Sequence, residues 1–121
     1  MFLEANGGWL VPWLERLDHH AQKFSWDVPW LKLLPSEYFR RQCWISFEPN
    51  DPTLPRVADL IGVDRILWAS DFPHSDAVYP GSVKALEQTI APLADSVKER
   101  IRGANAVAAY GLDQEDAWHT S

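Results

Sequence analysis

The feature that most constrains the fold is an unbroken apolar run inside the segment 65–70, which reads Arg-Ile-Leu-Trp-Ala-Ser. A strand with one face in water alternates apolar and polar residues, so this run predicts a strand buried on both faces, as in a parallel sheet. The segment 42–48 has the aromatic and β-branched content of a second strand. The segment 2–5 is predicted to be a short extended stretch that ends at two glycines.

Between these strands, apolar residues recur at helical spacing. After Pro12, which suits the first turn of a helix, the spacing predicts a helix with one buried face. That face consists of Leu10, Trp13, Leu14, Leu17, Ala21 and Phe24. The next segment, 25–37, is expected to be a packed irregular loop, because prolines interrupt its large apolar side chains.

Further helices are expected after the second and third strands. Thr53 is placed to cap a short helix, and Gly62 is placed to end it in the left-handed conformation. The remaining helical segments are 82–91, with Val83 on the inner face, 95–102, and 105–110, which Asn105 caps and Gly111 ends.

The resulting β-α-β-α-β-α order suits parallel βαβ units, but three strands do not close a barrel. A (β/α)₈ barrel takes eight units and roughly 250 residues, whereas this chain has 121. We assign 1–112 to one α/β domain and expect the tail 113–121 to be frayed. Seven Trp, five Phe and three Tyr are a heavy aromatic load, which predicts packing against a surface larger than so small a core offers.

Charge and cysteine content exclude several classes of protein. A net charge of −6 disfavours a nucleic-acid or anionic-membrane partner, because no surplus of cations is available to release counterions. No apolar run approaches the roughly 20 residues that cross a bilayer, and no secretory leader is visible at Met1, so a cytoplasmic location is expected. The single Cys43 rules out an internal disulfide and a thiolate zinc cage, and it is expected to be a small buried hydrophobe.

The strongest candidate site follows the third strand. Asp71 comes directly after the segment 65–70, His74 follows three residues later, and Asp76 comes next. Side chains that perform chemistry in parallel α/β folds lie at the carboxyl ends of strands, and a carboxylate with an imidazole can hold a divalent metal and transfer a proton. The same residues also suit a structural turn, in which Asp71 makes an Asx turn before Pro73.

The ends of the other strands give weaker candidates. Glu4 can face a substrate or hydrogen-bond a neighbouring loop, and Gly7-Gly8 can approach a ligand or make an ordinary turn. Trp9 can line a pocket for an aromatic substrate or belong to the core. The third candidate position is the segment 48–51, which follows the second strand.

Five ordered motifs of the chain resemble the C-terminal part of the amidohydrolase-related family, in the branch that includes aminocarboxymuconate-semialdehyde decarboxylase and resorcylate decarboxylases. The motifs cover about 2–112. They are LEANGGW at 3–9, WLERLD at 13–18, PSEYF at 35–39, ILWASDFPH at 66–74, and NA with YGL within 105–112.

The resemblance implies a partial (β/α)₈ barrel, in which the three strands are the sixth, seventh and eighth with their helices. It implies that Asp71 is a metal ligand and the acceptor of a proton, that His74 faces the substrate, and that Glu4, Asn6 and Trp9 lie at the substrate side of the sixth strand. The implied cofactor is a divalent metal, first of all zinc. The family's His-x-His or Glu-x-His ligands on the first strand and its His on the fifth are expected to lie before Met1.

The function implied by the resemblance is that of a metal-dependent hydrolase, in which a metal-activated water attacks a small-molecule substrate. The alternative within the family is a nonhydrolytic decarboxylase or hydratase. The decarboxylases carry a His on the sixth strand, whereas this segment has Glu4, Ala5 and Asn6. An alternative of another class is a catalytically silent partial barrel that covers its sheet edge with a partner chain or in a homo-oligomer.

Overall fold

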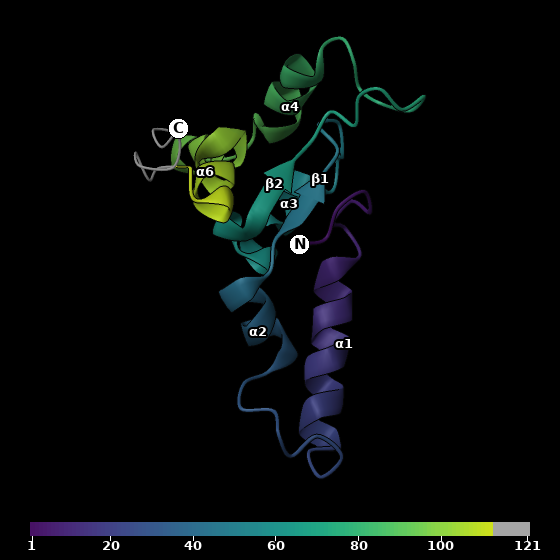
Figure 1. Ribbon diagram of the computed structural model, residues 1–121, viewed down its shortest axis with the longest axis vertical. Helices are drawn as coiled ribbons and strands as arrows, with labels where there is room; N and C mark the ends of the chain where they lie inside the picture. Colours follow the sequence, from purple (N-terminus) through teal and green to yellow (C-terminus); the bar gives the residue numbers. More distant parts are fainter. Residues whose placement is uncertain (113–121) are drawn as a thin grey trace, which may run out of the picture.

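The computed structural model describes residues 1–112 as a mixed helix and strand structure (Figure 1). The tail 113–121, which we expect to be frayed, lies outside the described residues. In chain order the elements are α1 (Leu10–Lys23), α2 (Pro35–Gln42), β1 (Ile45–Phe47), α3 (Leu54–Ile61), the 3₁₀ turn η1 (Val63–Arg65), β2 (Ile66–Trp68), α4 (Ser82–Ile90), α5 (Asp95–Glu99), the π-helical turn η2 (Arg100–Ala104) and α6 (Asn105–Tyr110).

Two short strands form a parallel sheet, as the apolar run of β2 predicts. β1 pairs with β2 in the register Ile45 to Ile66, and α3 with η1 makes the crossover between them. All three residues of β1 are buried, as are Ile66 and Leu67 of β2. The strands are shorter than the predicted segments 42–48 and 65–70, because α2 extends to Gln42 and η1 takes residues up to Arg65.

The predicted first strand is reduced to a single bridge at Phe2, which pairs in parallel with Ile45 on the far side of β1 from β2. The Phe2 N–H donates to the Trp44 carbonyl at 2.7 Å, and the Phe2 carbonyl accepts from the Ser46 N–H at 2.9 Å. Glu4 then adopts φ +57° and leaves the extended conformation. All three segments therefore run parallel to one another, although only β1 and β2 form a regular ladder.

The helices α1 and α2 lie side by side and extend away from the sheet (Figure 1). The prediction of a loop over 25–37 is wrong at its end, because α2 begins at Pro35. The Glu37 carboxylate accepts from the Leu34 N–H at 2.7 Å. From α1, the Asp18 carboxylate accepts from the Ser36 N–H at 2.8 Å and from its hydroxyl at 2.6 Å. These bonds satisfy N–H groups that a helix start leaves without partners.

The last three helical segments form a nearly continuous run, α5–η2–α6. Asn105 does not cap α6 as predicted, since it is the first helical residue and is only 3% exposed. Its side-chain amide instead donates to the Val63 carbonyl at 2.7 Å and to the Ile66 carbonyl at 2.8 Å. Helices α3 and α6 end at Gly62 and Gly111 as predicted, with φ of +105° and +64°, but only Gly111 adopts the left-handed helical conformation.

The buried core lies between the sheet and the helices that pack on it. Its members are Leu10, Leu14, Phe39, Ile45, Phe47, Leu54, Ala58, Ile61, Ile66, Leu86, Ile90 and Ile101. Two residues predicted to point inward are exposed, Trp13 by 55% and Val83 by 62%. Cys43 lies at the end of α2 rather than inside a strand and is half-buried.

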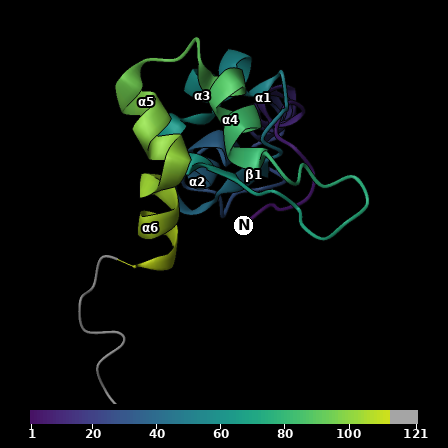
Figure 2. The same ribbon diagram turned by 90° about the horizontal axis from the view of Figure 1, so that it is seen from above.

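Within residues 1–112, no helix has the length and apolar character that crossing a membrane requires. The loop between β2 and α4 extends outward from the body (Figure 2).

Candidate functional site

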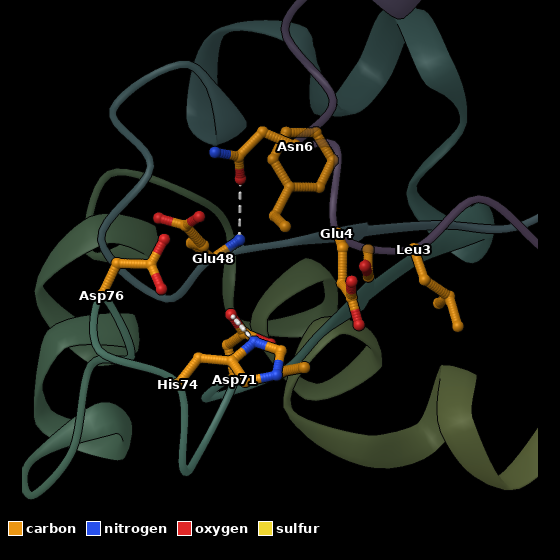
Figure 3. Close-up of a pocket in the computed structure, with 10 residues that line it drawn as sticks. Leu3, Glu4, Asn6, Glu48, Asp71, His74 and Asp76 are labelled. Atoms are coloured by element: carbon orange, nitrogen blue, oxygen red, sulfur yellow. Dashed lines mark hydrogen bonds and ion pairs between the residues drawn. The ribbon is translucent and has the colours of Figure 1, made fainter.

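The carboxyl ends of β1, β2 and the Phe2 segment surround one pocket of about 300 Å³ (Figure 3). The three segments run parallel, so their carboxyl ends lie at the same edge. The buried Ser46 and Phe47 lie among its lining residues. The pocket is lined by Leu3, Glu4, Asn6, Ser46, Phe47, Glu48, Ala69, Asp71, His74 and Asp76.

Asp71 and His74 are in contact within the loop that follows β2. The Asp71 Oδ2 and His74 Nδ1 atoms lie 3.1 Å apart. The backbone makes the same pairing, because the His74 N–H donates to the Asp71 carbonyl at 2.9 Å. Asp76 lies nearby, and one ligand atom from each of the three side chains falls within 4.8 Å of the others. The predicted Asx turn is not formed, because the Asp71 side chain contacts the His74 ring and accepts no backbone N–H from the described residues. A turn made by the backbone instead brings the carboxylates and the imidazole together at the pocket.

Several residues that line this pocket have a backbone in the left-handed region. Among the described residues, only three that are not glycine have positive φ, namely Glu4 at +57°, Asn6 at +48° and Asp71 at +60°. All three line the pocket. Such conformations cost of order 1–3 kcal/mol each outside glycine and are found most often at active and binding sites. Asn and Asp tolerate them better than Glu, because their short polar side chains can bond locally.

Asn6 and Glu48 connect the first segment to the end of β1. The Asn6 side-chain oxygen accepts from the Glu48 N–H at 2.9 Å, across 42 positions of sequence (Figure 3). The close approach of the first segment to β1 requires a glycine at position 7. A Cβ there would lie 2.7 Å from Cε1 of the Phe47 ring and closer still to Cζ and Cε2. Gly7 is therefore needed for close packing on β1, which favours the structural interpretation of the glycine pair.

Of the candidates after the second strand, Glu48 and Asp51 have different roles. Glu48 is exposed and lines the pocket. Asp51 is buried, and its Oδ1 accepts from the Thr53 N–H at 2.8 Å and from the Thr53 hydroxyl at 2.7 Å. Thr53 occupies the predicted cap position of α3, but its side chain makes no cap bond. Glu48 was identifiable only by its place at the end of a strand.

Trp9 lies outside the set of residues that lines the pocket. Its indole N–H donates to the carbonyls of Ala5 and Asn6, each at 2.9 Å, so the ring holds the preceding turn. Phe2 packs edge-on against it, with ring centroids 6.2 Å apart. The structure thus brings together Glu4, Asn6, Asp71 and His74 from the predicted set and leaves Trp9 beside them.

The charge of the pocket is negative. Its lining includes the carboxylates of Glu4, Glu48, Asp71 and Asp76 with the imidazole of His74, and no Lys or Arg of the described chain is among them. Four carboxylates at one mouth repel one another, and a bound cation or an N–H donor lowers that repulsion. The arrangement can therefore hold a cation or accept protons.

Comparison with known proteins agrees with the motifs. A family model described as amidohydrolase matches residues 5–112. The chain is similar to the solved structure of an amidohydrolase from Mycobacterium avium subsp. paratuberculosis, with a TM-score of 0.72 and 26% identity over 88% of this chain and 26% of that one. It is also similar to 5-carboxyvanillate decarboxylase LigW from Sphingomonas paucimobilis, with a TM-score of 0.64 and 31% identity over 84% of this chain and 30% of that one.

The comparison with curated proteins gave no match. The chain spans less than a third of the length of either solved structure. The family match nevertheless covers nearly the whole described part of the sequence, from the turn after Phe2 to the end of α6. The chain belongs to the amidohydrolase family.

Proposed function

We propose that residues 1–112 are the last three βα units of a (β/α)₈ barrel, in which the Phe2 segment, β1 and β2 are the sixth, seventh and eighth strands. The parallel order of the three segments supports this assignment, as does the similarity to about a quarter to a third of two longer chains of known structure. In such barrels the active site lies at the carboxyl ends of the strands, where the pocket is found.

The observation that carries the functional proposal is the position of Asp71 in that pocket. Asp71 follows β2 and lies with His74 and Asp76 in a group whose ligand atoms are within 4.8 Å of one another. Carboxylate oxygens and imidazole nitrogens are ligands that zinc accepts, at about 2.0–2.2 Å from the ion. The donor set therefore fits a divalent cation, and Asp71 is proposed to hold it.

In the proposed reaction, the cation would act as a Lewis acid and make a water molecule nucleophilic at neutral pH. Asp71 has one oxygen, Oδ2, paired with His74, and the other, Oδ1, would be available to hold the cation and to accept a proton. Glu4 and Glu48 line the same pocket from other segments, where they can accept hydrogen bonds from a substrate. The proposed substrate is a small molecule with a hydrolysable amide, ester or lactone-like group.

A decarboxylase or hydratase of the same family is the second candidate, because the chain is 31% identical to a decarboxylase over most of its length. Two observations favour hydrolysis. The first segment offers Glu4, Ala5 and Asn6 where the decarboxylases that the motifs resemble carry a His. The described lining also holds four carboxylates and no cationic side chain, so a carboxylate substrate would meet repulsion unless other segments supply positive charge.

Further ligands, by the same resemblance, would come from strands that precede these in the barrel. The isolated chain is therefore proposed to lack turnover by itself and to act only with the rest of a barrel. A partner chain or a homo-oligomer that covers the edge of the Phe2 segment would serve the same structural need. We propose an enzyme without nucleic-acid or membrane partners, in keeping with the net charge of −6, and a cytoplasmic location for it.

The test measures, by calorimetry, the binding of zinc to the purified chain and to its Asp71→Asn variant. We expect one zinc per chain, and we expect the variant to bind at least tenfold more weakly, because the amide has lost the charge that attracts the cation. Equal binding by both proteins would refute the assignment of Asp71. Ester hydrolysis and CO₂ release, assayed in parallel on a barrel completed with the missing units, would separate the two candidate reactions.

A further inference from the structure

The Asp71 carboxylate is held on one side only. Its Oδ2 lies 3.1 Å from Nδ1 of His74, whereas Oδ1 has no hydrogen bond within residues 1–112. In the tautomer with the hydrogen on Nδ1, the imidazole donates a hydrogen bond to this carboxylate oxygen. The Asp71 side chain is 29% exposed and that of His74 is 58% exposed, which places the imidazole on the solvent side of the carboxylate.

Backbone hydrogen bonds hold the loop segment that carries His74. The His74 N–H donates to the Asp71 carbonyl at 2.9 Å, and the Ala77 N–H donates to the His74 carbonyl at 3.2 Å. The loop is closed at its base by a bond of 3.1 Å from the Val78 N–H to the Ser70 carbonyl. The backbone of His74 is thus held by consecutive turns on both of its sides.

We propose that His74 is a positioning residue for the metal ligand. By donating from Nδ1 to Oδ2, it fixes the rotation of the Asp71 carboxylate so that Oδ1 faces the pocket, and it binds the cation through Asp71 rather than directly. This inference rests on the proposed function, because it needs a cation at Asp71. A ligating carboxylate that is itself hydrogen-bonded is better oriented, and loss of such a partner typically weakens metal binding by 10–100-fold.

The alternative is that His74 coordinates the cation with its own ring, since its nitrogen belongs to the same group of ligand atoms. The two roles differ in what can replace the imidazole. An Asn side chain places its amide nitrogen near the position of Nδ1 and can donate the same hydrogen bond, but it is a poor zinc ligand. The His74→Asn variant therefore separates the two roles.

The experiment measures the dissociation constant of zinc by calorimetry for the full 121-residue chain and for three variants. His74→Ala should weaken binding by about 10–100-fold, and His74→Asn should recover most of that loss. His19→Ala serves as the matched control, because His19 is exposed on α1 and is not among the residues that line the pocket, and its affinity should equal that of the unmodified chain. Urea unfolding of each variant checks that the fold is retained.

Three results would overturn the inference. Unchanged zinc affinity in His74→Ala would mean that the hydrogen bond to Asp71 has no positioning role. Equal weakening in His74→Ala and His74→Asn would mean that the imidazole itself binds the metal. Zinc binding that is absent, or that is insensitive to Asp71→Asn, would remove the proposed metal site as well, and this result is distinct from the first two.

Discussion

The close approach of Gly7 to the Phe47 ring makes a sharp prediction about stability and about the pocket. A Cβ at position 7 would overlap three atoms at the outer end of the ring. Phe47 is only 2% exposed and lies in the central segment of the three, so a displaced ring loses contacts with its neighbours. Gly7→Ala must therefore displace either the ring or the backbone next to Asn6.

The cost can be worked from these contacts. Overpacking a core typically costs 1–3 kcal/mol, and an overlap with three ring atoms belongs at the upper end, about 3 kcal/mol. The smaller entropy of the unfolded alanine chain offsets about 0.4–1 kcal/mol. The expected loss in the free energy of unfolding is therefore about 2 kcal/mol.

A double-mutant cycle tests the cause. Leucine at position 47 has no atoms equivalent to Cε and Cζ, so Phe47→Leu by itself should cost about 1–1.5 kcal/mol and remove the overlap. The double variant should then be about as stable as Phe47→Leu alone, with a coupling energy of about 2 kcal/mol.

Urea unfolding followed by circular dichroism measures each free energy. The matched control is Gly103→Ala, since a Cβ at this helical position meets no atom within 4 Å; it should leave stability unchanged or raise it by up to about 1 kcal/mol. A Gly7→Ala variant as stable as the unmodified chain, or free energies that simply add in the cycle, would refute the reasoning.

Two further predictions concern bonds remote from the pocket. Asn105→Ala should lower the free energy of unfolding by about 2–4 kcal/mol in urea unfolding, because it removes the donor to the partly buried Val63 carbonyl and the buried Ile66 carbonyl; a loss below about 0.5 kcal/mol would contradict this role. The Arg102 guanidinium, which donates to both oxygens of the Glu87 carboxylate at 2.6 and 2.7 Å, holds the pKa of Glu87 below its ordinary value of 4.5. The stabilisation from this pair is therefore present above that ordinary pKa and is lost as the pH falls through the lowered pKa. Glu87→Gln should be slightly less stable than the unmodified chain near neutral pH and equal to it in strong acid, with a difference that salt also reduces, and a difference independent of pH would argue against the ion pair.

Much of the fold could be predicted because its signals are local. The continuous apolar run predicts the buried strand β2, and the spacing of Leu10 and Leu14 predicts the buried face of α1. Gly62 marks the end of α3 for the same reason, since its positive φ is a property of one residue. Asp71 and His74 are likewise only three positions apart, so one turn brings them into contact.

The errors in prediction occur where a distant segment decides the conformation. Asn105 has the residue type of a helix cap, but the carbonyls of Val63 and Ile66 engage its amide from across the core. The start of α2 involves Asp18, which lies on another helix. The local signals for this helix start were Pro35 at its first position and Glu37 in its first turn.

The sequence by itself determined the alternation of strands and helices, the family and the candidate Asp71, because each depends on residues that are neighbours along the chain. Only the tertiary structure decided which candidates share a pocket. Asn6 reaches Glu48 across 42 positions, and Gly7 makes room for Phe47, while Trp9 folds back on its own turn. Contacts between segments that are remote in sequence depend on parallel strand pairing and side-chain volume, and local periodicity contains neither.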